Sequence, residues 1–309
     1  MNRWWLRPAV RIAVALVLPA AVPAIITLLI WALPGDPASI ICPPQSCGGT
    51  AALADRWHLN SGPWAFYQDW VSRALQGDFG NSWRLQQGVA VMELLREAIP
   101  TTLGLLFLGL LPIVIATVGA ATGRLPAKVD PVAQVVGLVP AVVMALVGAA
   151  IIEITYGSMS FEGTAGWMRL GAGALVLGFA DGAFSATVAG VRSLFQSENK
   201  QRYARVAQLR GERRLDNTLP NVAPALAGQL RARVLHLVSG LVVVEVVLRL
   251  DGIGDLLWGG TLLQDFGVVL AAATGFAALS AALLALQAVV EVLVALHVRR
   301  TPPVPGRAA

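Results

Sequence analysis

The chain has 309 residues, of which 56% are hydrophobic and only 13% charged, and its formal net charge is +5. A water-soluble fold could not bury this much apolar surface, so the composition excludes a soluble globular domain and indicates an integral membrane protein. Basic segments between the apolar stretches account for the positive charge, and no nucleic-acid partner is needed to explain it.

Six apolar stretches are long enough to cross a bilayer, because a hydrocarbon core about 30 Å thick needs roughly 20 apolar residues per helix. The expected fold class is therefore an all-α integral membrane protein with about six transmembrane helices. Their expected bounds are Ala9–Leu33, Thr101–Ala121, Pro131–Tyr156, Leu170–Val191, Leu219–Leu248 and Val268–Leu296.

Lys and Arg are distributed unevenly between the segments that connect these spans. If the N-terminus is inside, the inner segments hold 15 of these residues and the outer segments only 6. Cytoplasmic loops carry an excess of Lys and Arg, so we expect both termini to be cytoplasmic, including the tail 301–309. The basic segment 192–219 is then a cytoplasmic loop, and the protein is a multi-pass component of the cell membrane.

Residues 1–100 are expected to form an N-terminal anchor helix followed by an extracytoplasmic segment. Part of that segment is amphipathic and rich in aromatic residues, notably Trp64, Phe66, Tyr67 and Trp70. Such a pattern suits a helix that lies on the membrane interface, and it equally suits a packed cap over the spans. Both interpretations remain open from the sequence.

Cys42 and Cys47 are the only cysteines, and both fall in this extracytoplasmic segment. An oxidising compartment would favour a small disulfide loop between them. Two thiols alone are a poor metal site, and we expect no metal to be bound.

Several short motifs follow one another along the chain. Pro-Gly-Asp-Pro follows the first span at residue 34, and Gln-Gly-Asp-Phe-Gly and Pro-Thr-Thr precede and enter the second. Tyr203 to Gly211 reads Tyr-Ala-Arg-Val-Ala-Gln-Leu-Arg-Gly, and Val-Val-Val-Glu245 is followed by Gly252-Ile-Gly254. In this order the motifs resemble the permease subunits of dipeptide/oligopeptide/nickel-type ABC importers. Tyr203 to Gly211 is similar to that family's EAA loop, the Glu245 to Gly254 stretch resembles the end of its fifth core span, and Glu291 stands where its last span usually carries an acidic residue.

The resemblance implies the architecture of a type I ABC importer permease, with a transmembrane core over 101–300. It also implies the partners: a second homologous permease subunit, two cytoplasmic ABC ATPase subunits and an extracytoplasmic solute-binding protein, in addition to membrane lipid. Peptide is the default solute, and nickel or another small solute is the alternative. In such permeases the EAA loop is a coupling helix received by the ATPase.

Residue chemistry is compatible with that docking role. Gly211 has the backbone freedom to stop a helix sharply. Ala204 and Ala207 share a helical face that would let a partner approach closely, and Arg205 and Arg210 can meet acidic groups. The site expected from this loop comprises Tyr203, Ala204, Arg205, Ala207, Arg210 and Gly211. An ordinary basic loop held near anionic lipid headgroups is the competing interpretation.

ATP hydrolysis by this chain is excluded, because the P-loop pattern G-x-x-x-x-G-K-[ST] needs a glycine before its lysine. The two lysines, Lys128 and Lys200, follow Ala127 and Asn199. We therefore expect no bound cofactor, with ATP and Mg²⁺ used by the partner ATPase.

Four ionisable residues fall inside the expected spans: Asp181, Arg231, Arg233 and His236. A charge at that depth costs about 2.5–3.5 kcal/mol on insertion scales, so these side chains should face protein or water. The arginines either line a translocation path that favours an anionic solute, or one of them pairs with Asp181 to join two spans. Helical phase separates Arg231 and Arg233 by about 200°, so they cannot face the same wall.

Two other functional classes have weaker support. Gly252-Ile-Gly254-Asp255 matches the G-x-G-D string of intramembrane aspartyl proteases, but no tyrosine in the chain is followed by the aspartate their second motif requires. An ion-coupled secondary transporter would be indicated by inverted repeats, and no clear internal repeat is present. The sequence therefore predicts a transport protein that is not itself an enzyme.

Overall fold

A computed structural model describes residues 6–41, 50–156, 164–212 and 214–300 of the chain. Within these ranges the regular elements are all helical, apart from one isolated antiparallel bridge between Asn81 and Ala90. The expected all-α class is thus confirmed. The α-helices are α1 (Leu6–Ala32), α2 (Pro37–Ile41), α3 (Thr50–Arg56), α4 (Pro63–Ala74), α5 (Val91–Thr122), α6 (Val129–Gly137), α7 (Ala141–Tyr156), α8 (Thr164–Phe179), α9 (Ala183–Asn199), α10 (Arg202–Leu209), α11 (Arg214–Leu248), α12 (Ile253–Leu262) and α13 (Phe266–Arg300), with 3₁₀ turns η1 (Leu59–Ser61) and η2 (Ala180–Gly182).

Four segments of the described chain are long and apolar enough to cross a membrane, or five if the bent pair α6 and α7 is counted as one span. The four are Pro8–Ala32, Val91–Thr122, Gly166–Asn199 and Phe266–Leu293. The fifth expected span, Leu219–Leu248, corresponds to α11, whose 35 residues would extend about 52 Å. Its length is sufficient, but Arg231, Arg233 and Glu245 make it less apolar than the others.

The third and fourth expected spans are not straight helices, contrary to the sequence-based bounds. A 90° bend separates α6 from α7, and η2 interrupts the helix between α8 and α9. The two breaks lie against each other, since a Cβ added to Gly137 would come within 2.8 Å of the Cα of Gly182. Asp181, with φ at 51°, donates its N–H to the carbonyl of Val139 at 3.3 Å, and its carboxylate accepts the N–H of Ala141 at 3.3 Å. Each break therefore supplies hydrogen-bond partners that the other lacks.

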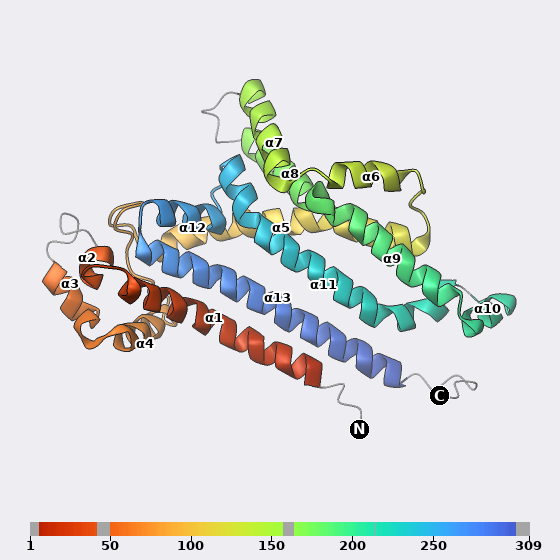
Figure 1. Ribbon diagram of the computed structural model, residues 1–309, viewed down its shortest axis with the longest axis horizontal. Coiled ribbons are helices and arrows are strands. Elements are labelled where there is room, and N and C mark those ends of the chain that lie inside the picture. The colour runs from red at the N-terminus through yellow and green to blue at the C-terminus, as the bar shows by residue number, and fades with distance from the viewer. Residues whose placement is uncertain (1–5, 42–49, 157–163, 213, 301–309) are drawn as a thin grey trace.

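The long helices form a bundle whose two ends differ (Figure 1). α1 packs along α13, while α11 packs against α5, α7, α9 and α12. The start of α1, the helix α10 and the end of α13 lie at one end, and α2, α3, α4 and α12 lie at the other (Figure 1). Fully buried leucines, Leu105, Leu237 and Leu241, form the centre of the core. The start of α1, the basic helix α10 and the end of α13 thus lie at the same end of the bundle (Figure 1).

The aromatic segment that includes α4 is a packed cap rather than a free interfacial helix. Phe66 and Trp70 of α4 are 1% and 3% exposed, and they pack in one cluster with Ile30 of α1 and Leu270 of α13. The Tyr67 hydroxyl also donates to the carbonyl of Ala20 at 2.9 Å. Cys42 and Cys47 lie outside the described residues, so their pairing stays a prediction.

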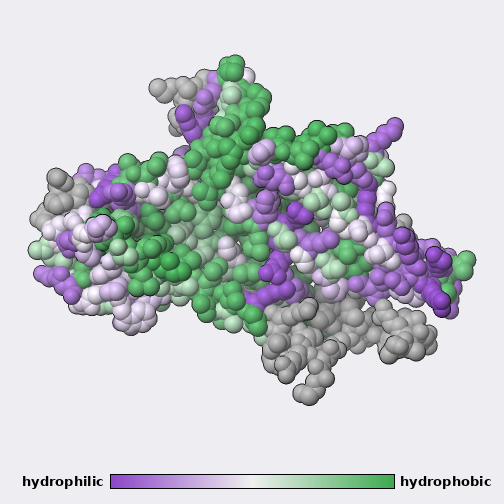
Figure 2. Space-filling model, in the orientation of Figure 1, coloured by the Kyte–Doolittle hydropathy of each residue, from purple (hydrophilic) through white to green (hydrophobic). Residues whose placement is uncertain are grey.

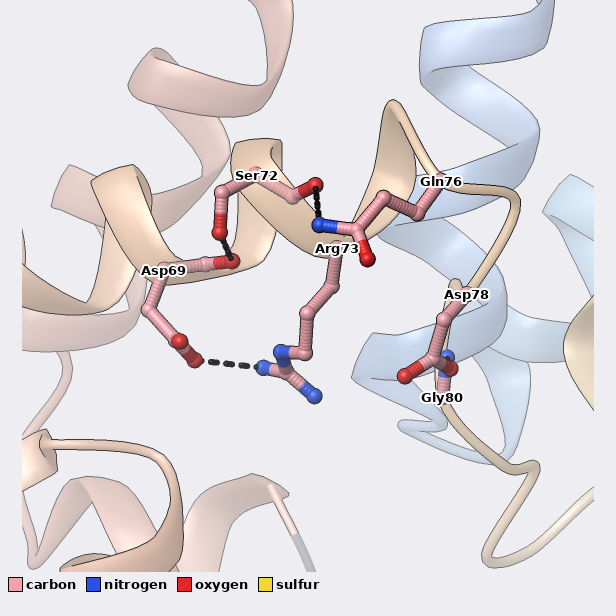
Figure 3. A network of polar contacts seen from close by, with 6 residues as sticks. All are labelled: Asp69, Ser72, Arg73, Gln76, Asp78 and Gly80. Carbon is pink, nitrogen blue, oxygen red and sulfur yellow. Dashed lines mark hydrogen bonds and ion pairs between the residues drawn. The ribbon is translucent and has the colours of Figure 1, made fainter.

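Polar contacts stiffen the end of α4 (Figure 3). Arg73 pairs with Asp69 at 2.8 Å, and its guanidinium lies 5.0 Å from the centre of the Trp57 ring. The Ser72 hydroxyl donates to the carbonyl of Asp69 at 2.8 Å, and the Gln76 amide donates to the carbonyl of Ser72 at 3.0 Å. The cap is therefore held by both aromatic packing and local polar contacts.

Asp265 fastens the loop that follows the cap to the start of α13. Its side chain is fully buried, and one carboxylate oxygen accepts the Ser82 hydroxyl at 2.6 Å. The same oxygen accepts the backbone N–H groups of Trp83, Arg84 and Leu85 at 2.9, 2.9 and 3.1 Å. The other oxygen accepts the N–H of Val268 at 3.4 Å, as an N-cap residue does.

Glu245 fastens α12 to α5 and α11 in a similar way. This buried carboxylate accepts the Thr102 hydroxyl at 2.7 Å and the N–H of Gly254 at 2.6 Å. The Thr102 oxygen in turn accepts the N–H of Ile253 at 2.8 Å. A Cβ on Gly252 would stand 2.3 Å from the Glu245 carboxyl carbon, so close packing explains the first glycine of Gly252-Ile-Gly254.

We predict that Gly252→Ala lowers the free energy of unfolding by roughly 1–3 kcal/mol, because the added methyl group must displace the buried Glu245 carboxylate. Gly228→Ala is the matched control, since a Cβ there has no neighbour within 4 Å and alanine favours a helix. Thermal unfolding in detergent measures both. Equal midpoints for the two variants would contradict the packing role of Gly252.

We predict that Asp265→Ala costs roughly 2–4 kcal/mol of stability and exposes the peptide bond after Arg84 to trypsin, because four donors lose one buried acceptor. Asp78→Ala removes an exposed carboxylate that accepts only the N–H of Gly80, at 2.9 Å, and serves as control. Mass spectrometry of timed digests measures the cleavage rate. Unchanged cleavage in Asp265→Ala would show that this loop is held by other contacts.

Candidate functional site

The helix α10 connects α9 and α11 and ends in a Schellman motif. Glu212 donates its N–H to the carbonyl of Ala207 at 3.1 Å, and Gly211 donates its N–H to that of Gln208 at 3.0 Å. Gly211 has φ at 78° and open space around it, so the glycine is required by the backbone and not by packing. The sharp stop expected at Gly211 is present.

The surface of α10 is apolar at its centre and basic around it. Leu209 is 88% exposed and Val206 46% exposed, which is unusual for residues on a short polar helix. Arg205 and Arg210 are exposed beside them. The sequence analysis missed Val206 and Leu209, although their spacing of three residues on an amphipathic helix is a signal that could have found them.

The alanine face expected to receive a partner is only partly available. Ala204 is 2% exposed because it packs within this chain, whereas Ala207 is half-buried. Ala204 therefore holds α10 against its own helices, and the expectation that it presents an open docking surface is wrong. The exposed surface is instead centred on Val206 and Leu209.

Tyr203 ties α10 to both neighbouring helices. Its hydroxyl donates to the carboxylate of Glu198 at the end of α9 and accepts the side-chain N–H of Asn221 in α11 at 2.7 Å. A displacement of α10 would thus be passed to α9 and α11 together.

The loop that carries α10 is shorter than expected. α9 continues to Asn199 and α11 begins at Arg214, so most of the expected loop 192–219 is helical. Arg192 lies within α9, pairs with Asp130 and donates to the carbonyl of Leu125 at 2.7 Å. It therefore joins α9 to α6 rather than adding to the exposed charge around α10.

The four ionisable residues of the spans do not form one cluster. His236 lies 4.0 Å from Asp181, a separation that gives an ion pair only when the histidine is protonated. Within the described part of the chain Arg231 and Arg233 make no ion pair, so the alternative in which one of them pairs with Asp181 is not found. The basic side chain beside Asp181 is instead that of His236, which the sequence analysis placed in the same group of residues.

One face of α11 differs from the other exposed helix surfaces. Its exposed residues there are small: Ala225, Gly228, Ala232 and Ser239. Leu219 is the one large hydrophobic residue that α11 exposes among its described side chains, whereas α7 exposes Val143, Leu146 and Ile151. The space-filling view shows hydrophilic patches along α11 toward α10 and a hydrophobic surface over α7 (Figure 2). This face of α11 is therefore unlike a surface that meets lipid chains.

Neither a metal site nor a catalytic pair emerges from the described residues. They contain no group of three His, Cys, Asp or Glu side chains placed to hold a metal ion. Burial raises the pKa of Asp255, and the neighbouring charge of Asp251 raises it further. The glycines before Asp255 are accounted for by the close approach of the chain to Glu245, so the G-x-G-D string has a packing reason.

Comparison with known proteins gives one consistent result. Residues 113–301 match the family described as binding-protein-dependent transport system inner membrane component. The chain is also similar to proteins named glutathione transport system permease protein GsiC from Shigella boydii serotype 4 and Escherichia coli K12. Each is 27% identical over 264 residues, which cover 80% of this chain and 84% of the relative.

The family match extends from the middle of α5 to the end of α13, and so includes α10 and all of α11. Its members are transport permeases of the inner membrane and not enzymes. The chain belongs to the family of binding-protein-dependent transport system inner membrane components, the permeases of ABC importers.

Proposed function

We propose that this chain is a permease subunit that moves a solute inward with energy supplied by separate ATPase subunits, which bind α10. The exposed pair Val206 and Leu209 beside basic side chains is the observation that carries the proposal. ATP and Mg²⁺ are used by those partners, since this chain has no P-loop.

The contacts of α10 suit the transmission of force. An exposed leucine can fill an apolar pocket in a partner, and the surrounding arginines can meet acidic groups at its rim. Tyr203 links α10 to α9 and α11, while the Schellman motif fixes where the helix ends. Because α10 is held in this way, a partner that displaces it would also displace α9 and α11, while α10 itself stays helical.

The translocation path is proposed to run along the small-residue face of α11. A bundle of this kind needs a second permease subunit to enclose such a path, and Ala225, Gly228, Ala232 and Ser239 leave room for a solute between the two. The cap at the opposite end of the bundle is the surface on which an extracytoplasmic binding protein would deliver that solute.

Peptide is the proposed class of solute. Relatives at 27% identity are named glutathione transport system permeases, and glutathione is a small peptide. Arg233 and His236 lie on one side of the small-residue face of α11 and would favour carboxylate-bearing solutes there. For nickel, the other solute of the importers that this chain resembles, the described residues offer no group of three His, Cys, Asp or Glu side chains placed to hold a metal ion.

We predict that Leu209→Asp weakens the binding of purified ATPase subunits by roughly 30-fold, the loss of about 2 kcal/mol expected when an apolar anchor is replaced by a charge. The permease itself should stay folded, because Leu209 is 88% exposed. Leu75→Asp is the matched control, since Leu75 is 84% exposed in the cap at the other end of the molecule.

Equal ATPase binding by Leu209→Asp, Leu75→Asp and the unchanged chain would refute docking at α10. Reconstituted vesicles provide a separate check on the class of transporter. If this chain alone accumulated solute from an ion gradient without ATP, it would be a secondary transporter.

We predict that Gly211→Val uncouples transport from ATP hydrolysis, because valine at positive φ is strained and would alter the stop of α10. Gly123→Val is the matched control, as Gly123 has φ at 71° and equally open surroundings at the end of α5. Both variants should lose about 1–2 kcal/mol of stability.

The ratio of solute moved to ATP hydrolysed measures this coupling in the assembled importer. Only Gly211→Val should lower that ratio. The same ratio in both glycine variants would mean that the stop of α10 has no part in coupling.

A further inference from the structure

A groove of about 270 Å³ separates α11 from α13 toward the α10 end of the bundle. Its walls are apolar, formed by residues such as Leu230, Val234, Leu283 and Leu286, and its two polar lining residues are Arg231 and Gln287. Nearer the cap the same helices are in contact, because Leu237 and Leu241 pack in one cluster with Phe276 and Leu279. The groove therefore begins where α11 and α13 diverge.

Arg231 is the unmatched charge of this groove. No ion pair or hydrogen bond of its side chain is formed with any residue that the structure describes. Gln287 donates to Glu291 at 2.7 Å, and Glu291 is paired with Arg11 of α1. Glu291 is thus already matched, and since Arg231 has no anionic partner among the described residues, it can attract an anion from outside the chain.

The depth of the groove fits the headgroup level of one leaflet. Glu291 lies one helical turn beyond Gln287, and its partner Arg11 lies three residues after Pro8, where the apolar span of α1 begins. The Arg231 side chain leans toward the start of α11, which is the α10 end, because helical side chains tilt toward the N-terminus. Its guanidinium can therefore reach the level of Arg11 while its stem stays among apolar side chains.

The outer wall of the groove continues into a surface typical of lipid contact. Leu286, Val289, Val290 and Leu293 of α13 are 61%, 50%, 40% and 59% exposed. A groove that is walled by aliphatic side chains and continuous with this exposed surface suits a flexible acyl chain that arrives from the lipid.

We propose that this groove binds one anionic phospholipid, with its phosphate on Arg231 and an acyl chain between α11 and α13. Basic pockets between transmembrane helices at the cytoplasmic side are a recognised kind of site for anionic headgroups. The proposal depends on the membrane location of the chain and not on the docking of an ATPase to α10, so each can fail without the other.

Native mass spectrometry of the full chain, purified in detergent, tests the site with phosphatidylglycerol and phosphatidylcholine as probes. Arg231→Met keeps the length of the side chain and removes its charge, and it should reduce phosphatidylglycerol binding roughly fivefold. Arg233→Met is the matched control, because Arg233 is also half-buried on α11 but does not line the groove. It should bind phosphatidylglycerol as the unchanged chain does.

A second variant guards against misfolding of the first. Arg231→Lys keeps the charge and should retain most of the phosphatidylglycerol binding. The proposal is overturned if Arg231→Met binds as much phosphatidylglycerol as the unchanged chain, if Arg233→Met loses as much, or if phosphatidylcholine binds equally well. It is also overturned if Arg231→Met instead releases a co-purified protein or alters peptide uptake while lipid binding is unchanged.

Discussion

The cap end of the bundle depends on a buried carboxylate that has no cation beside it. Within the described residues Glu245 is satisfied by the Thr102 hydroxyl and by backbone N–H groups at the start of α12. A helix that begins inside a membrane protein must find partners for its first N–H groups, because lipid offers none. Glu245 and Thr102 meet that need for α12 and so fix α5, α11 and α12 together.

At the opposite end of the bundle the described residues include no fully buried carboxylate of this kind. There α11 and α13 diverge, and α10 is held by Ala204 and by the hydroxyl of Tyr203. α11 runs without interruption over 35 residues from one end of the bundle to the other. In contrast, a 90° bend separates α6 from α7, and the 3₁₀ turn η2 separates α8 from α9. An unbroken helix that is fixed at the Glu245 end and pushed at the α10 end can move as a rigid lever. The interrupted pairs α6–α7 and α8–α9 can move with it, because their breaks already contact each other.

The sequence predicted the class of fold and the position of α10 well, because both depend on local signals. Apolar length identifies a span, and a glycine after a short polar helix identifies its stop. The break at Asp181 was not predicted, since it is stabilised by a backbone carbonyl of another span, that of Val139. The burial of Ala204 was missed for the same reason, because a neighbouring helix decides which side of α10 faces inward.

The charges of α11 show why the translocation path could not be assigned from sequence alone. Three basic side chains fall within six residues, yet helical geometry sends them in different directions. His236 faces Asp181 at the break of the fourth span, whereas Arg231 lines the groove beside α13. The small-residue face of α11 lies between these directions. A solute moving along that face would pass between two basic groups with different surroundings: His236 has the carboxylate of Asp181 beside it, whereas Arg231 has no carboxylate partner among the described residues.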